Sequence, residues 1–276
     1  MPPAESAEFS NWQIAAIAFF ALLAAGIILA IANTVRRGEM NVLQCVLWCV
    51  AYLLCKLLWR TRWLNSPQIP PGQGALIVCN HRSSVDPFFI QAATGRKVHW
   101  MVASEYCKHP AFGSFLRSCE VIPVNRGGID TAATKMAIRL ASEGGVVGML
   151  PEGRINMSED FMLPVRPGVG LVALKAGVPV IPCYIHGAPY RRTVASPLFM
   201  TARVEVRFGL PLDPKDFTGD GEERAAEQFT LALVRAIAAL AERHDFEPRM
   251  AGRNWKPTTQ QLEEAMAAKD AREGLI

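Results

Sequence analysis

The sequence has no block of lysines and arginines, no Cys-x-x-Cys pair and no internal repeat. Its 276 residues carry a formal net charge of only +4, which does not predict the concentrated basic face of a nucleic-acid-binding protein. Half of the residues are apolar and 20% are charged, so a disordered chain and an acidic solvating protein are excluded. The seven cysteines are an odd number, and we expect reduced, buried thiols rather than disulfides or a metal site.

A long apolar segment lies near the amino terminus. Residues 14–32 include no charged or strongly polar side chain, and as a helix they would extend about 28 Å, close to the thickness of the hydrocarbon layer of a bilayer. A signal peptide would start with basic residues and have a shorter apolar run, although Ala30-Ile31-Ala32 resembles a cleavage site and keeps cleavage open. A buried core helix would rarely be apolar on every side over this length. We therefore predict a transmembrane helix over residues 13–32.

The charges on the two sides of this helix predict its orientation. Glu5 and Glu8 precede it without any lysine or arginine, whereas the residues that follow it include Arg36, Arg37, Lys56, Arg60 and Arg62. By the positive-inside rule, the chain after the helix lies in the cytoplasm. We expect a single-pass protein of the cell membrane with its soluble domain on the cytoplasmic side.

A second apolar stretch spans residues 42–59. It contains Gln44 and Lys56 and is followed by two arginines, a pattern that favours a helix lying in the membrane interface. A helix packed on the soluble domain is the alternative. We assign residues 1–65 to a membrane anchor that includes both helices.

Short apolar runs alternate with helical segments after the turn at Pro70-Pro71-Gly72. Strands separated by helices predict an α/β domain over residues 66–245, with a largely parallel sheet flanked by helices, and leave a peripheral tail at 246–276. Ligands bind beyond the carboxyl ends of the strands in such sheets. The strands are expected at 75–79, 98–103, 121–124, 146–150, 179–185 and 203–208, and the helices at 87–94, 131–142, 168–176 and 222–243.

The first group of polar residues follows the strand expected at 75–79 and reads Asn80-His81-Arg82-Ser83-Ser84-Val85-Asp86. A general base uses this combination, because imidazole takes a proton near neutral pH and a carboxylate orients it and stabilises the imidazolium. His81 and Asp86 can meet only if the loop folds back, and Ser83-Ser84 suit such a turn. The alternatives are that Asp86 only caps the next helix and that His81 is an ordinary loop residue.

Two further polar groups follow later strands. Arg126 stands ahead of two glycines and a helix, which suits the binding of an anion by a guanidinium and backbone N–H groups. Pro151-Glu152-Gly153-Arg154 follows the strand at 146–150, where Glu152 could hold a substrate hydroxyl or support the histidine and Arg154 could bind phosphate. A solvated arginine and a local ion pair are the corresponding alternatives.

Together these segments resemble the glycerolipid acyltransferase family, of the lysophosphatidic acid acyltransferase type. The first block resembles the family's His-x4-Asp motif, and residues 66–215 contain three further blocks in the family's order. These are Val121 to Arg126, Pro151 to Gly153 with Arg154, and the apolar Ala176-Gly177-Val178-Pro179-Val180-Ile181-Pro182. An amino-terminal helical membrane anchor is a further feature in common.

The resemblance implies that an acyl group moves from an acyl-CoA or acyl-carrier-protein thioester to a lysophospholipid hydroxyl, giving phosphatidic acid from 1-acylglycerol-3-phosphate. It implies no cofactor and no metal beyond the thioester co-substrate. His81 would be the general base and Asp86 would orient it, so that no acyl-enzyme is needed. Arg126, Glu152, Gly153 and Arg154 would form the acceptor site.

One block departs from the family pattern. The family usually has a threonine between the glycine and the arginine, whereas Arg154 follows Gly153 directly. The shift puts the phosphate-binding role of Arg154 in doubt, and Arg166 could supply the missing cation. Another amphiphile, such as a lyso-aminolipid or a glycolipid, therefore stays open as the acceptor, and so does a non-catalytic lipid-binding protein. A hydrolase is disfavoured because the sequence has no Gly-x-Ser-x-Gly motif.

Overall fold

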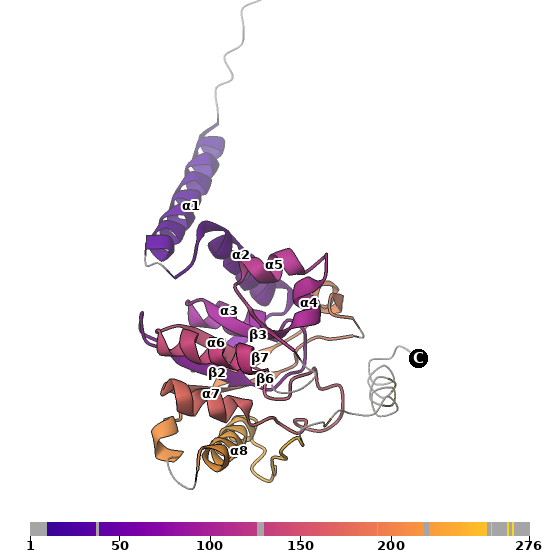
Figure 1. The fold of residues 1–276 in the computed structure, drawn as a ribbon. Helices are drawn as coiled ribbons and strands as arrows, with labels where there is room; N and C mark the ends of the chain where they lie inside the picture. Colours follow the sequence, from indigo (N-terminus) through magenta and orange to yellow (C-terminus); the bar gives the residue numbers. More distant parts are fainter. Residues whose placement is uncertain are drawn as a thin grey trace, which may run out of the picture. The chain divides into compact units, whose positions relative to one another are not determined.

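The computed structural model describes residues 10–36, 39–125, 130–191, 193–217 and 221–252, together with residues 255, 264 and 267. The chain divides into two compact units, Met1–Leu47 and Trp48–Ile276. The first unit contains the long helix α1 (Asn11–Arg36), so the predicted amino-terminal helix is confirmed as a helix (Figure 1). Among the described residues, no helix combines the length and the hydropathy that crossing a membrane requires. The transmembrane role of residues 13–32 stays a prediction.

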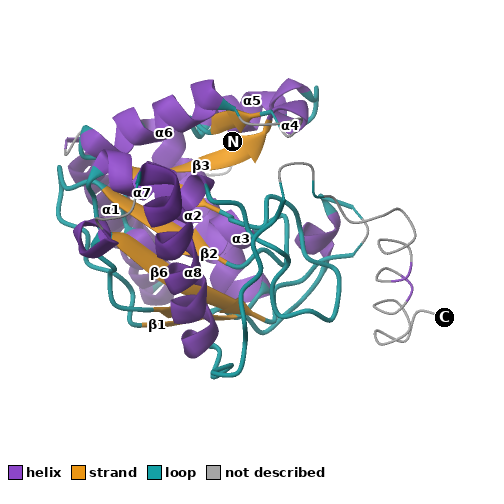
Figure 2. Cartoon of the chain, turned by 60° about the horizontal axis from the view of Figure 1, so that its bottom comes forward, coloured by secondary structure: helices purple, strands orange, loops and turns teal. Residues whose placement is uncertain are grey.

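The second unit is built on a seven-stranded sheet with the order β1-β7-β6-β2-β5-β3-β4. Neighbouring strands are parallel except β6 and β7, which are antiparallel, so the predicted α/β fold with a largely parallel sheet is confirmed (Figure 2). The strands are β1 (Arg62–Leu64), β2 (Ala75–Cys79), β3 (Val98–Ala103), β4 (Ile122–Val124), β5 (Val146–Met149), β6 (Val180–His186) and β7 (Glu205–Phe208).

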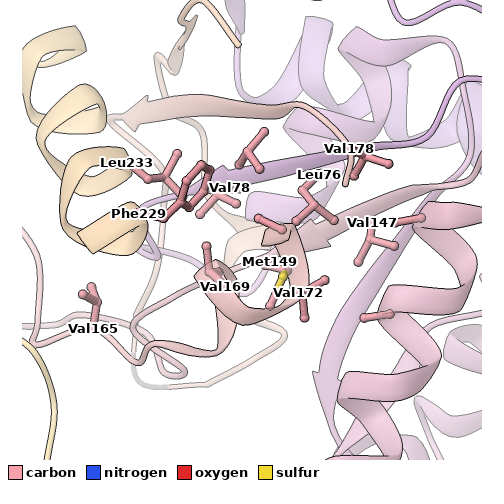
Figure 3. Close-up of a cluster of buried hydrophobic side chains, with 14 of the residues drawn as sticks. Leu76, Val78, Val147, Met149, Val165, Val169, Val172, Val178, Phe229 and Leu233 are labelled. Atoms are coloured by element: carbon pink, nitrogen blue, oxygen red, sulfur yellow. The ribbon is translucent and has the colours of Figure 1, made fainter. Parts of the chain in front are cut away.

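Helices cover both faces of the sheet. Leu76 and Val78 of the central strand β2 point into one apolar cluster, while Ala75, Ile77 and Cys79 point into the other, as the alternation of a strand requires. The first cluster is completed by α6 (Thr131–Ser142), α7 (Gly168–Ala176) and α8 (Glu222–Leu240), and Figure 3 shows its side chains. The second is completed by α3 (Asp86–Thr94) and by the end of the helix before β1. Because both faces are covered, β2 is buried throughout.

The second predicted helix is present as α2 (Val42–Leu53), which continues into a π-helical turn, η1 (Leu54–Leu58). Within the second unit, Cys55 and Trp59 are fully buried in the cluster that also contains α3. The end of this helix therefore packs on the sheet, one of the two arrangements that the sequence allows. Leu53 and Leu57 face outward and are exposed.

Several short elements were not predicted. They are β1, the helices α4 (Ser104–Lys108) and α5 (Gly113–Ser118), and the 3-10 turns η2 (Ser196–Phe199) and η3 (Pro214–Phe217). Each has six residues or fewer, too few to display the periodicity by which helices and strands are recognised. The three residues of β1 become a strand only because β7 pairs with them in parallel.

Candidate active site

The segment after β2 folds back on itself and brings His81 to Asp86. The Nδ1 atom of His81 lies 2.9 Å from Oδ2 of Asp86, so the predicted pairing is confirmed. Asp86 is the first residue of α3 and is fully buried, whereas the imidazole keeps some exposure at the carboxyl edge of the sheet. The pair therefore occupies the edge at which ligands bind in parallel sheets.

Three donors converge on Oδ2 of Asp86. Besides the imidazole, the backbone N–H groups of Arg82 and Ser83 donate to it over 2.7 and 2.8 Å. An ionised carboxylate can only accept, so Nδ1 of the neutral imidazole carries the proton and Nε2 keeps its lone pair. Oδ1 is buried without a hydrogen-bond partner in the described part of the chain. The arrangement fixes the tautomer in which Nε2 can act as a base.

The other polar side chains of this block hold the loop in place. The side-chain amide of Asn80 donates to the carbonyl of Ile185 and accepts the N–H of the same residue. These two bonds continue the β2–β6 ladder beyond the end of β2. Ser83 donates to the carbonyl of Pro189 and Ser84 donates to the carbonyl of Val194. The two serines therefore do more than form a turn, because they tie the block to the loop after β6.

Glu152 supports the backbone of His81. One carboxylate oxygen accepts the N–H of His81 over 2.7 Å, and the other accepts the N–H of Leu163 over 2.8 Å. The N–H of Asn156 donates to the carbonyl of His81, so the loop after β5 binds His81 from both sides of its peptide. Glu152 is buried, with both oxygens engaged by backbone donors. Of the two roles that the sequence suggests for Glu152, the geometry favours support of the histidine.

We expect Glu152 to make stability depend on pH. Burial raises the pKa of Glu152 to about 8, although the amide hydrogen bonds from Leu163 and His81 lower it. The folded chain therefore holds this proton more tightly than the unfolded chain, whose value is 4.5. Relative to Glu152→Gln, the free energy of unfolding of the wild type is highest below this unfolded value and falls as the pH rises to about 8, by at most about 1.4 kcal/mol per pH unit.

Urea unfolding of the wild type and of Glu152→Gln between pH 5 and 8 tests this expectation. The difference between their free energies of unfolding isolates Glu152, because all other titrations cancel. Glu223→Gln, which changes an exposed residue of α8, is the control and should follow the wild type at every pH. If the free energies of unfolding of the wild type and Glu152→Gln differ by the same amount at every pH in this range, the buried carboxyl is not the source of any pH dependence.

Arg82 is a site residue that the sequence did not single out. Its guanidinium donates to four backbone carbonyls of the loop after β5, at distances of 2.6 to 3.3 Å. The carbonyls belong to Asn156, Ser158, Asp160 and Phe161. The neighbouring residues in the sequence do not indicate whether an arginine between a histidine and an aspartate supports a loop or binds substrate. The contacts arise only because the sheet places β2 beside β5.

The predicted acceptor residues follow two other strands in the sequence, Arg126 after β4 and the other three after β5. Gly153 has a φ of +67°, a left-handed conformation that suits glycine, and it directly follows Glu152. The guanidinium carbon of Arg154 lies 6.0 Å from the ring centroid of Trp255. Arg126 lies outside the described residues, as do residues 127–129. The structure thus brings His81, Asp86 and Glu152 together and leaves the position of Arg126 untested.

Arg166 lies beside the glycine of the third block. Its Nε is 3.8 Å from the point where a β-carbon on Gly153 would lie, and its backbone N–H donates to the carbonyl of Pro151. The guanidinium of Arg166 therefore lies next to this loop, although the chain lacks the threonine that the family usually has between the glycine and the arginine. The suggestion that Arg166 supplies the cation that the shortened block lacks stays a prediction.

A cavity of about 480 Å³ lies next to the segment Asn80–Asp86. Asn80 and Arg82 contribute to its lining, together with Tyr184 and His186 of β6 and Arg243 beyond α8. His81 is not among the lining residues.

Comparison with known proteins identifies a family. The family model described as Acyltransferase matches residues 60–186, which contain the His81–Asp86 pair and Glu152. The chain is 27% identical over 182 residues to 1-acyl-sn-glycerol-3-phosphate acyltransferase of Bacillus subtilis (strain 168), a match that covers 66% of this chain and 88% of that protein. It is 26% identical over 204 residues to the protein of the same name from Streptococcus pneumoniae (strain ATCC BAA-255 / R6), covering 70% and 74%.

A solved structure has the same fold. The crystal structure of the 1-acyl-sn-glycerophosphate (LPA) acyltransferase PlsC from Thermotoga maritima superposes with a TM-score of 0.54 and covers 81% of this chain and 92% of that chain. At 19% identity this likeness concerns the fold alone. The family match, the two relatives and the His-x4-Asp block agree on one assignment. These comparisons support the glycerolipid acyltransferase family for this chain and an O-acyltransferase activity.

Proposed function

We propose that the chain transfers an acyl group from a thioester to the free hydroxyl of 1-acylglycerol-3-phosphate and so produces phosphatidic acid. The observation that carries the proposal is the contact of 2.9 Å between His81 and the buried Asp86. Nε2 of His81 takes the proton of the hydroxyl as its oxygen attacks the thioester carbonyl, the C–S bond breaks, and the thiolate leaves. The names of the relatives from Bacillus subtilis and Streptococcus pneumoniae support this acceptor.

The acceptor phosphate is proposed to bind next to the loop after β5. Arg154 and Arg166 both belong to or adjoin this loop, and Arg126 follows β4 in the sequence. Guanidinium groups suit phosphate because they offer paired donors in a planar arrangement. Glu152 and Gly153 shape the loop rather than contact the phosphate, since both oxygens of Glu152 accept backbone N–H groups.

We also propose that the chain works at the cytoplasmic side of the cell membrane, with an acyl-CoA or an acyl-carrier protein as the donor. The apolar sequence of residues 14–32 and the basic residues that follow it support this placement. A lysophospholipid is itself a membrane component, so an enzyme that uses it must reach a lipid surface.

An assay with purified, detergent-solubilised protein tests the function. Labelled acyl-CoA is offered with a panel of lysolipids that differ in headgroup, and a second series uses acyl-carrier protein as the donor. The expected product is labelled phosphatidic acid from 1-acylglycerol-3-phosphate. Preferential acylation of a lyso-aminolipid or a glycolipid would change the acceptor while keeping acyl transfer, and acylation of no lysolipid with either donor would overturn the proposal.

A further inference from the structure

The proposed transfer step places no substrate in the cavity of about 480 Å³ beside the segment Asn80–Asp86. Its volume lies within the range of small-molecule binding sites, which is about 300–1,000 Å³. The lining combines this segment and the end of β6 with the loop after β5 and with Ala241 and Arg243 beyond α8. The neighbouring strands β2 and β6 thus end at the cavity, where parallel sheets bind ligands.

The cavity shares its wall with the polypeptide that holds the histidine. Arg82, which follows His81 directly, lines the cavity, and so does Asn156, whose N–H donates to the carbonyl of His81 over 2.7 Å. The imidazole itself does not line the cavity. A ligand bound here would therefore lie beside the reacting hydroxyl rather than at it.

The cavity is positively charged. Arg243 is exposed, and its guanidinium makes no hydrogen bond or ion pair with any residue that the structure describes. Burial raises the pKa of Tyr184 in the lining, whereas the charges of Arg82, Arg207 and Arg243 lower it, so three guanidinium groups act on one phenol. The lining also contains one carboxylate, that of the exposed Glu159. The free donors of Arg243 suit an anion, and phosphate matches their planar arrangement.

Aromatic rings form another part of the lining. The ring centroids of Phe161 and Tyr184 are 5.7 Å apart, and the Tyr184 hydroxyl lies 3.3 Å from Nδ1 of His186. Ring surface that accepts a flat group thus lies in the same cavity as an unpaired guanidinium. A nucleotide has both matching parts, an aromatic base and phosphate groups.

The two substrates differ in where they carry their phosphates. In 1-acylglycerol-3-phosphate the hydroxyl and the phosphate are on neighbouring carbons, so this phosphate must bind close to the imidazole of His81. In acyl-CoA the whole pantetheine arm separates the thioester from the phosphates and the adenine. A site that adjoins His81 but excludes its side chain therefore fits the donor rather than the acceptor. An acyl-carrier protein has the same arm but no base that would fill a cavity.

We propose that this cavity binds the nucleotide end of acyl-CoA, with the guanidinium of Arg243 on a phosphate and the adenine against the rings of Phe161 and Tyr184. The inference rests on the proposed function, since it names the site of the acyl donor. It assigns CoA rather than a carrier protein as that donor. Arg82 contributes charge alone, because its terminal N–H groups are bound to carbonyls of the loop after β5.

Binding of adenosine 3′,5′-bisphosphate to the full chain in detergent tests the site without any turnover. This probe is the nucleotide end of CoA without the pantetheine arm, and calorimetry gives its Kd. We expect Arg243→Ala to raise the Kd at least about tenfold, because it removes charge-assisted hydrogen bonds to phosphate. Arg235→Ala is the control, since this exposed arginine of α8 pairs with Glu247 and does not line the cavity. Its Kd should equal that of the wild type.

A kinetic measurement extends the test to the substrate. The KM for acyl-CoA should rise in Arg243→Ala by a similar factor, and the KM for the lysolipid should not follow it. The probe should compete with acyl-CoA and not with the lysolipid. Thermal unfolding of the variant should match that of the wild type, because Arg243 has no side-chain partner in the described part of the chain.

Absence of probe binding to the wild type would overturn the proposal, and so would equal Kd values in the wild type and Arg243→Ala. Acyl transfer from acyl-carrier protein but not from acyl-CoA would also overturn it. The calorimetric result is separate from the fate of the proposed function. If the probe binds through Arg243 but no lysolipid is acylated, the proposed function fails and the nucleotide site stands. If acyl-CoA is used with no effect of Arg243, the function stands and this site is removed.

Discussion

Replacing His81 with alanine is expected to lower the kcat of acyl transfer by about 10²–10⁴-fold, the usual contribution of a positioned general base. Without the imidazole, no group in contact with Asp86 can take the proton of the attacking hydroxyl. The KM for the lysolipid should change little, because the proposed phosphate-binding residues are untouched. Steady-state kinetics in detergent with both substrates varied would measure the two constants separately.

The same variant must still fold for the loss to be informative. The backbone of His81 keeps its bonds to Glu152 and Asn156 when the side chain is shortened, so thermal unfolding should be close to that of the wild type. His244→Ala removes an exposed histidine outside the segment Asn80–Asp86 and should leave kcat unchanged. A well-folded His81→Ala protein with the wild-type kcat would remove the histidine from the mechanism.

Much of the α/β domain could be predicted because its elements begin and end with strong local signals. Asp130 accepts the N–H of Ala133 at the start of α6, and Gly177 takes the left-handed conformation that ends α7. Both helices have the predicted bounds, and so do the strands β2 and β3. The interactions that decide the ends of the two helices lie within a few residues of the chain, where sequence patterns are informative, and the two strands are recognisable as short apolar runs.

The supports of the site could not be predicted in the same way. Glu152 reaches His81 across 71 positions of sequence, and Arg82 binds carbonyls 74 to 79 positions away. Ser83 and Ser84 bind partners more than 100 positions away. These contacts depend on the order of strands in the sheet, which places the ends of β5 and β6 on either side of β2. The pairing of His81 with Asp86 was accessible because it needs only one local turn.

Asp86→Asn is expected to lower kcat by at least about 10²-fold while the fold persists. The amide oxygen can replace Oδ2 and accept the same three donors, and the amide nitrogen takes the place of Oδ1. The change therefore removes the negative charge and keeps the shape. The imidazolium that forms as His81 takes the proton then lacks its counter-charge in a buried site, which raises the barrier to proton transfer.

Asp86 does not cap α3, because it is the first residue of that helix and its side chain accepts the N–H groups of Arg82 and Ser83 ahead of it. Two further variants separate its positioning role from a structural role in this loop. Asp86→Ala leaves the N–H groups of Arg82 and Ser83 buried without an acceptor, at a cost of about 1–3 kcal/mol each, so it should lower both stability and kcat. Asp213→Asn changes an exposed aspartate that accepts one backbone N–H before η3, and it should affect neither. Full kcat in Asp86→Asn together with an unstable Asp86→Ala would leave Asp86 with a purely structural role, and His81 would then act as a base without a carboxylate to orient it.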